Sequence, residues 1–268
     1  MQFSIIYAVI IIITFVIAII VTTKNYKELT KKVDRYVTDV VEPTLNSMIP
    51  DLEYMPTVPG EYRRIILGKY EQYGMYYNET YKTLSDYIST SKNHFETFIL
   101  RTVRDDSDRA GYPMFHGTMM YFETNTGLND NDIIKISVRV PYMLSTRPLT
   151  VDKSRTLNLN EYKTGVDKFD RSYCITSTSF ELVNNIITDY VIDKLIWFRQ
   201  VYGDFSVCII KNCIFLTILN KNAISLIEAP YNFSVDHVAD RIKFIKKIPN
   251  DLMFVISKSK ERNDVIFK

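Results

Sequence analysis

The chain opens with an unbroken apolar run that lacks any charged side chain. From Phe3 to Val21 isoleucine and valine predominate. A helix needs about 20 apolar residues to cross a bilayer, and only a helix pairs all backbone polar groups within one span. The run has no early basic residue and exceeds the apolar region of a signal peptide. The pattern predicts an uncleaved transmembrane anchor in residues 1–23, contacting membrane lipid through residues 3–22.

Basic side chains follow this run, and none precedes it. An excess of Lys and Arg beside a span marks its cytoplasmic side, so we expect a single-pass protein of the cell membrane whose domain faces the cytoplasm. The alternative is that these lysines belong to a solvated helix, because Glu28 and Asp34 accompany them. The basic residues are Lys24, Lys27, Lys31, Lys32 and Arg35.

Apolar residues then recur every three or four positions, which indicates an amphipathic helix. We interpret residues 24–60 as a helical stalk followed by an irregular entry, Met48–Gly60, because four prolines interrupt the pattern. Arg63–Tyr73 again has a helical pattern, with Ile66 and Tyr70 on one stripe. The apolar positions of the stalk are Tyr26, Leu29, Val33, Tyr36 or Val37, Val40 and Val41.

A β-rich part follows, in which short runs of β-branched and aromatic residues alternate with polar links. Consecutive short strands with tight links favour antiparallel pairing. Phe169–Ser177 has the pattern of a later strand. The four consecutive strand segments are Tyr87–Ser91, Phe95–Val103, Met114–Glu123 and Ile133–Val140.

The C-terminal part predicts a hairpin between two helices. Ser179 can cap a helix that ends at Gly203. Phe205–Ile210 and Cys213–Leu219 are separated by two residues, which predicts a tight hairpin that pairs Ile210 with Cys213 and Cys208 with Phe215. A second helix is expected over Ser234–Lys247, and Asp251–Ser257 is ambiguous.

These patterns together predict an α+β protein with one N-terminal transmembrane helix, a helical stalk and a soluble domain of antiparallel strands packed with helices. The domain covers residues 61–268. Its division into two sub-modules near residues 141–168 stays open.

Charge and cysteine content narrow the function classes. The formal charge is +2, from 33 basic and 31 acidic residues, so no nucleic-acid partner is indicated. The three cysteines form no CxxC pair, which suits a reducing compartment. Cys208 and Cys213 would lie diagonally on one face of the hairpin, beyond comfortable disulfide reach. We therefore expect free thiols.

No motif assigns a catalytic, cofactor or metal site. The glycines lack the spacing of a nucleotide-binding loop, and His94, His116 and His237 lack the spacing of a zinc site. The acidic run Asp105, Asp106 and Asp108 is read as a solvated loop rather than a cation site. Asn129–Asp132 is read as turn chemistry rather than a calcium loop. We assign no catalytic, cofactor-binding or metal-ligating residue.

Two short matches follow the order found in penicillin-recognising serine enzymes. Ser89–Lys92 matches SxxK, and Lys163–Gly165 matches KTG. Those enzymes place the serine at the start of a buried helix, whereas Tyr87–Ser91 has a strand pattern. We interpret the coincidence as accidental.

Four segments resemble an uncharacterised bacterial family of membrane-anchored proteins, known only as a domain of unknown function. The resemblance spans about Val40 to Leu219. It implies no catalytic residues, and it implies a LemA-like membrane protein as a partner. Family members often carry two membrane helices, whereas this sequence predicts one. The segments are Pro113–Met120, Phe169–Ser177, the helix around Ile186-Ile187-Thr188, and the hairpin Ser206–Ile218.

The leading hypothesis is therefore a membrane-anchored, cytoplasm-facing interaction or scaffold module. The alternative is a membrane-associated enzyme such as a hydrolase, whose site only the fold would assemble. A third hypothesis is binding of a small ligand or a lipid headgroup beside the basic segment Lys24–Arg35.

Overall fold

The structure is a computed structural model, and it describes residues 2–49, 51–75, 81–90, 95–103, 113–142, 145–149, 157–219, 226 and 234–256. The helices are α1 (Gln2–Tyr36), the π-helical turn η1 (Val37–Val41), α2 (Glu42–Met48), α3 (Gly60–Glu71), α4 (Asp167–Ser172), α5 (Phe180–Ile186), α6 (Asp189–Tyr202) and α7 (Val235–Ile256). The strands are β1 (Leu52–Thr57), β2 (Tyr81–Thr90), β3 (Phe95–Val103), β4 (Pro113–Glu123), β5 (Ile134–Tyr142), β6 (Ser145–Pro148), β7 (Asn160–Tyr162), β8 (Tyr173–Ser177), β9 (Asp204–Ile210) and β10 (Cys213–Leu219).

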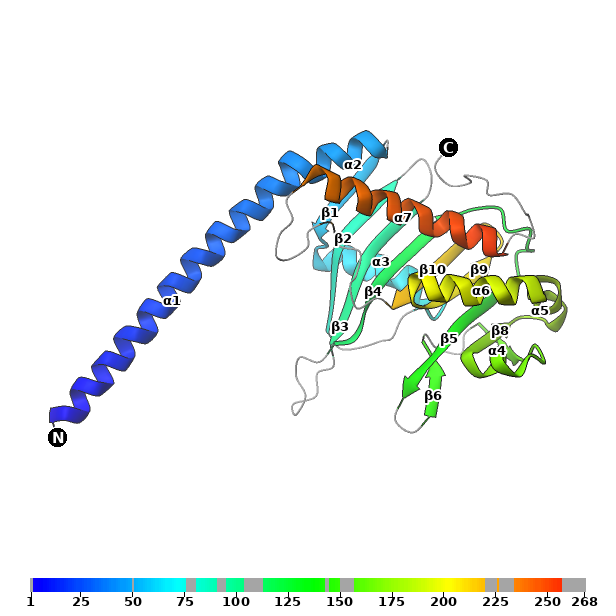
Figure 1. Ribbon diagram of the computed structural model, residues 1–268, viewed down its shortest axis with the longest axis horizontal. Coiled ribbons are helices and arrows are strands. Elements are labelled where there is room, and N and C mark those ends of the chain that lie inside the picture. The colour runs from blue at the N-terminus through cyan, green and yellow to red at the C-terminus, as the bar shows by residue number, and fades with distance from the viewer. Residues whose placement is uncertain are drawn as a thin grey trace.

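The strands form one antiparallel sheet in the order β1-β2-β3-β4-β10-β9-β5-β8-β7, with β6 paired to β5 (Figure 1). The β9–β10 hairpin comes late in the chain but inserts between β4 and β5. Strands from both sides of residues 141–168 therefore belong to one sheet. The division into two sub-modules stays a prediction.

Helices cover the two faces of the sheet unequally. On one face η1, α2, α5, α6 and α7 contribute to a large apolar core with Phe122, Ile136 and Leu216. On the other face α3 packs Ile66, Leu67 and Tyr70 into a smaller core. Alternate side chains of each strand point to opposite faces, so nearly continuous apolar strands such as β10 can serve both cores.

Several predicted elements are confirmed. Strand β3 has the predicted bounds, and the β9–β10 hairpin pairs Ile210 with Cys213 and Cys208 with Phe215. All three cysteines are free and buried. Asn129–Asp132 forms a turn in which the Asp132 carboxylate accepts from Asn129 N at 3.0 Å.

Other boundaries differ from the predictions for identifiable reasons. The entry segment contains β1, which pairs with β2 although Pro56 lies within it. The helix predicted after Ser179 is two helices, because the Thr188 hydroxyl accepts from Val191 N and starts α6 anew. Residues 169–172 of the predicted strand belong to α4 instead. Helix α7 continues through Pro249 to Ile256.

The helical segment at the N-terminus also differs from the prediction. Helix α1, η1 and α2 follow one another without a break up to Met48. Pro43 does not interrupt them. A proline ring in a regular α-helix clashes with the carbonyl four residues earlier, here that of Asp39. The wider π-helical turn Val37–Val41 contains Asp39, ends two residues before Pro43 and relaxes that spacing.

The predicted transmembrane anchor is wrong. Within the described ranges, no helix combines the length and the apolar character that crossing a membrane requires. The apolar run is not an element of its own, because α1 continues from it into the segment that contains Lys24, Lys31 and Arg35. The predicted single-pass location in the cell membrane rested on that span and is therefore also wrong.

Candidate functional site

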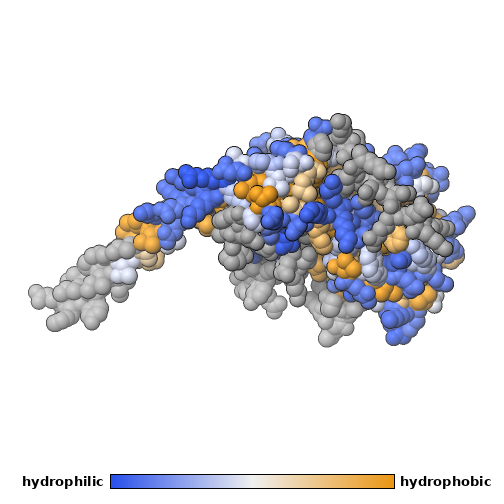
Figure 2. All heavy atoms as spheres, turned by 45° about the horizontal axis from the view of Figure 1, so that its top comes forward, coloured by the Kyte–Doolittle hydropathy of each residue, from blue (hydrophilic) through white to orange (hydrophobic). Residues whose placement is uncertain are grey.

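Helix α1 is the most exposed apolar element in the described part of the chain. It projects from the sheet domain (Figure 1), and Figure 2 shows a hydrophobic patch on it, followed toward the domain by hydrophilic residues. Phe15 is 67% exposed, Ile20 60% and Tyr26 69%. A helix that is apolar on all sides is normally buried against other structure. Its exposed large apolar residues are Phe15, Val16, Ile19, Ile20, Val21 and Tyr26.

The base of α1 is packed into the domain through the buried Tyr36. Tyr36 is 5% exposed and belongs to the large core. Burial, and then the charge of Asp86, raise the pKa of Tyr36. Asp86 also accepts a hydrogen bond of 2.7 Å from the Tyr54 hydroxyl of β1. The end of α1 is therefore held firmly while the part before it extends outward.

The basic segment of α1 borders an open hollow. The described residues that line it all belong to α1, so it offers one side of a helix rather than an enclosed cavity. Two isoleucines line one end of the hollow, and three lysines, a glutamate and a threonine line the rest. This is the place where the third hypothesis expects a ligand. The described lining residues are Ile19, Ile20, Thr23, Lys24, Lys27, Glu28 and Lys31.

A polar cluster around the buried Glu96 carboxyl lies under α3. The Tyr87 hydroxyl of β2 donates to Glu96 Oε2 of β3 at 3.2 Å. Lys69 Nζ of α3 lies 3.8 Å from the same oxygen and 3.2 Å from the ring centroid of Tyr121. Burial raises the pKa of Glu96, and Lys69, Tyr70 and Tyr87 oppose that rise. The cluster links α3 to the sheet through the ion pair of Lys69 with Glu96, to which the Tyr87 hydroxyl also donates.

The same face of the sheet also carries a buried lysine, Lys135. Lys135 of β5 donates its Nζ proton to Gly74 O, and the Thr217 hydroxyl donates to Met75 O at 2.9 Å. These bonds hold the turn after α3 against the sheet. Lys135 is directly opposite Cys208 in the register. Both polar groups thus act in positioning α3 rather than in forming an open site.

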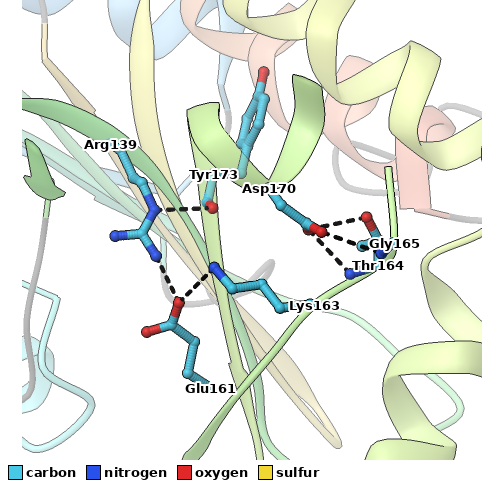
Figure 3. Close-up of polar contacts among 7 residues, drawn as sticks. All are labelled: Arg139, Glu161, Lys163, Thr164, Gly165, Asp170 and Tyr173. Atoms are coloured by element: carbon cyan, nitrogen blue, oxygen red, sulfur yellow. Dashed lines mark hydrogen bonds and ion pairs between the residues drawn. The ribbon is translucent and has the colours of Figure 1, made fainter. Parts of the chain in front are cut away.

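The KTG residues form a structural turn (Figure 3). Asp170 of α4 accepts from Thr164 N at 3.0 Å, from the Thr164 hydroxyl at 2.9 Å and from Gly165 N at 3.1 Å. Lys163 and Arg139 share Glu161 Oε1, at 3.1 Å and 2.6 Å. Ser89 lies on β2, near the opposite end of the sheet from β7. The fold therefore does not bring the two short matches together.

The remaining sequence candidates are dispersed. His116 lies on β4 opposite Arg101, and burial together with that positive charge lowers its pKa. His237 lies in the first turn of α7, where its backbone N donates to Ser234 Oγ at 3.1 Å. His94 and the acidic residues of the predicted loop, Asp105, Asp106 and Asp108, lie outside the described residues. No group of three His, Cys, Asp or Glu suited to a metal occurs within the described ranges.

The cysteines have the chemistry of core residues. Burial raises the pKa of Cys208 to about 12 and the pKa values of Cys174 and Cys213 to about 11. The thiolate is the reactive form of cysteine, so all three remain unreactive thiols near neutral pH.

Comparisons with known proteins identify no family. No protein-family model matches the chain, and no curated protein matches it. Among solved structures, the crystal structure of the mycobacterial trehalose monomycolate transport factor A, TtfA, is similar with a TM-score of 0.38 and 8% identity, over 78% of this chain and 91% of that chain. This likeness is too weak to assign a fold or a function.

Proposed function

We propose that this protein is an interaction module whose α1 binds an α-helical segment of a partner. The exposure of the apolar side chains of α1 carries the proposal. Phe15, Ile19 and Ile20 are each at least half exposed. Fully burying one large apolar side chain stabilises a complex by about 1.5–3 kcal/mol. Such a helix in water is far from its most stable environment.

The shape of the molecule supports a helical partner. Helix α1 has 35 residues, which corresponds to a rod of about 52 Å. Most of this rod stands clear of the sheet domain (Figure 1). An isolated helix gains most of its stability from packing an apolar face, and a second helix lying along it covers such a stripe over its full length.

A photo-crosslinking amino acid at Phe15 tests the proposal in cells that express the full chain. Phe15 is 67% exposed on α1, and Ile65 is 73% exposed on α3, so Ile65 is a matched control. We expect a discrete protein adduct from position 15, mapped by peptide sequencing to a helical segment, and none from position 65. A lack of protein adduct at position 15, or the same adducts from both positions, would contradict the proposal.

A further inference from the structure

We propose that the partner of α1 is a second copy of this chain, and that two α1 helices form a parallel, two-stranded coiled coil. This inference rests on the proposed function and names its partner. It starts from a spacing of alternating four and three residues along α1. The positions with described side chains are Phe15, Ile19, Thr22, Tyr26, Leu29 and Val33.

This spacing is that of the a and d positions of a heptad repeat. Ile19, Tyr26 and Val33 occupy a, and Phe15, Thr22 and Leu29 occupy d. A strict 3.5-residue period makes two helices supercoil around each other and keeps the seam between them. In the sequence, Ile5, Ala8 and Ile12 continue the same spacing toward the N-terminus.

The charged residues of α1 avoid this seam. Lys24 and Lys31 occupy the f position, which points directly away from a partner helix. Lys32, at g, is the one charged residue at an e or g position between Phe15 and Tyr36. The seam is therefore flanked by few charges that would repel an identical helix. The other charged positions are Lys27 and Asp34 at b, and Glu28 and Arg35 at c.

Three of the six described seam residues are of the types that favour two strands. β-Branched residues at a combined with Leu at d favour parallel dimers over trimers or tetramers. Ile19 and Val33 are the β-branched a residues, and Leu29 is at d between Tyr26 and Val33.

The two ends of α1 decide the orientation. Phe15–Val21 is apolar on all sides, whereas Lys24–Arg35 is charged outside the seam. In a parallel pair the apolar part faces its own equivalent. In an antiparallel pair it would lie beside the charged part, so the apolar residues that flank its seam would adjoin Lys32 rather than other apolar side chains. Because α1 projects from one end of the domain (Figure 1), a parallel pair places both domains beyond the base of the seam.

Disulfide trapping of the full chain tests the inference. Identical d positions face each other in a parallel pair, so Thr22→Cys should crosslink under mild oxidation at least about tenfold faster than the control Lys24→Cys at the outward f position. Both native residues are exposed, and the three native cysteines are buried. Light scattering of the reduced protein should give twice the chain mass of 31.4 kDa.

The outcomes separate this inference from the proposed function. A photo-adduct at position 15 with a different protein, combined with a monomeric mass, overturns the second copy but leaves helical binding intact. A dimer in which Thr22→Cys crosslinks no faster than Lys24→Cys overturns the parallel register. A threefold chain mass overturns two strands. A monomer that sediments with phosphatidylcholine vesicles and yields no protein adduct overturns both proposals.

Discussion

Helices α1 and α7 both carry many apolar side chains, yet their surroundings are opposite. In α7, Val238, Ile242 and Leu252 are fully buried against the sheet domain. In α1, Phe15 and Ile19 are at least half exposed. The periodic pattern of a helix shows that it has a face to bury. It does not show whether the same chain supplies the cover.

The cover of α7 comes from neighbouring elements of its own chain. It packs against α2 and α6, and the Tyr202 hydroxyl of α6 donates to Asp251 Oδ2 of α7 at 2.7 Å. The corresponding cover for α1 is, in our account, a second molecule. The comparison requires that substitutions in the domain lower the stability of the fold and that substitutions on α1 do not. The following experiments test this difference.

The largest expected effect is at a buried residue of α7. Ile242→Ala should lower the free energy of unfolding by about 2–5 kcal/mol, because it leaves a cavity in the core. Ile20→Ala on α1 should change it by no more than about 0.5 kcal/mol. Urea denaturation at low protein concentration measures both. Equal losses would mean that α1 packs against its own domain.

A smaller effect is expected at the polar link between α6 and α7. Tyr202→Phe removes the donor to the buried Asp251 carboxylate, which should cost about 1–3 kcal/mol. Tyr26→Phe, the matched change on exposed α1, should cost less than about 0.5 kcal/mol. Thermal melts of the two variants give the comparison. An unchanged stability of Tyr202→Phe would show that this hydrogen bond does not stabilise the packing of α7.

Two glycines outside α1 test how closely the sheet domain is packed. A Cβ at Gly117 would lie 2.1 Å from Ile218 O of the neighbouring strand, whereas one at Gly68 would meet nothing within 4 Å. Gly117→Ala should destabilise by about 1–3 kcal/mol. Gly68→Ala, within α3, should stabilise by about 0.5–1 kcal/mol. Destabilisation of the same size in both variants, seen in urea melts, would contradict the described packing.

The smallest effect is a pH dependence at Glu96. Its pKa is raised in the folded state, so the folded state binds this proton more tightly than the unfolded state does. That contribution to stability is present below the ordinary carboxyl pKa and is lost as pH rises through the raised value. Stability measured in urea from about pH 4 to about pH 7 should shift in favour of Glu96→Gln relative to the wild type. Parallel pH profiles would contradict the assigned burial.

Local patterns predicted those elements whose stability is local. Two apolar runs rich in β-branched residues and the two-residue link between them specify the β9–β10 hairpin. The break at Thr188 and the continuation of α7 through Pro249 depend on capping and on packing against α6, which spacing alone does not reveal. Strand β1 forms despite Pro56 because β2 pairs with it.

The candidate site was predicted only in part. The stripe beginning at Tyr26 was visible in the sequence, and its extension to Phe15 was available as the same three-and-four spacing. Within the run Phe3–Val21 nearly every position is apolar, so this spacing does not stand out, and the run also has the composition of a membrane span. The exposure of α1 required three-dimensional information.

Hydrogen exchange of the full chain at two concentrations tests the central claim most directly. We predict that amides of residues 15–29 are protected at high concentration and lose that protection on dilution, while amides of α7 stay protected at both. The account is contradicted if residues 15–29 exchange rapidly at every concentration, or if their protection does not change on dilution.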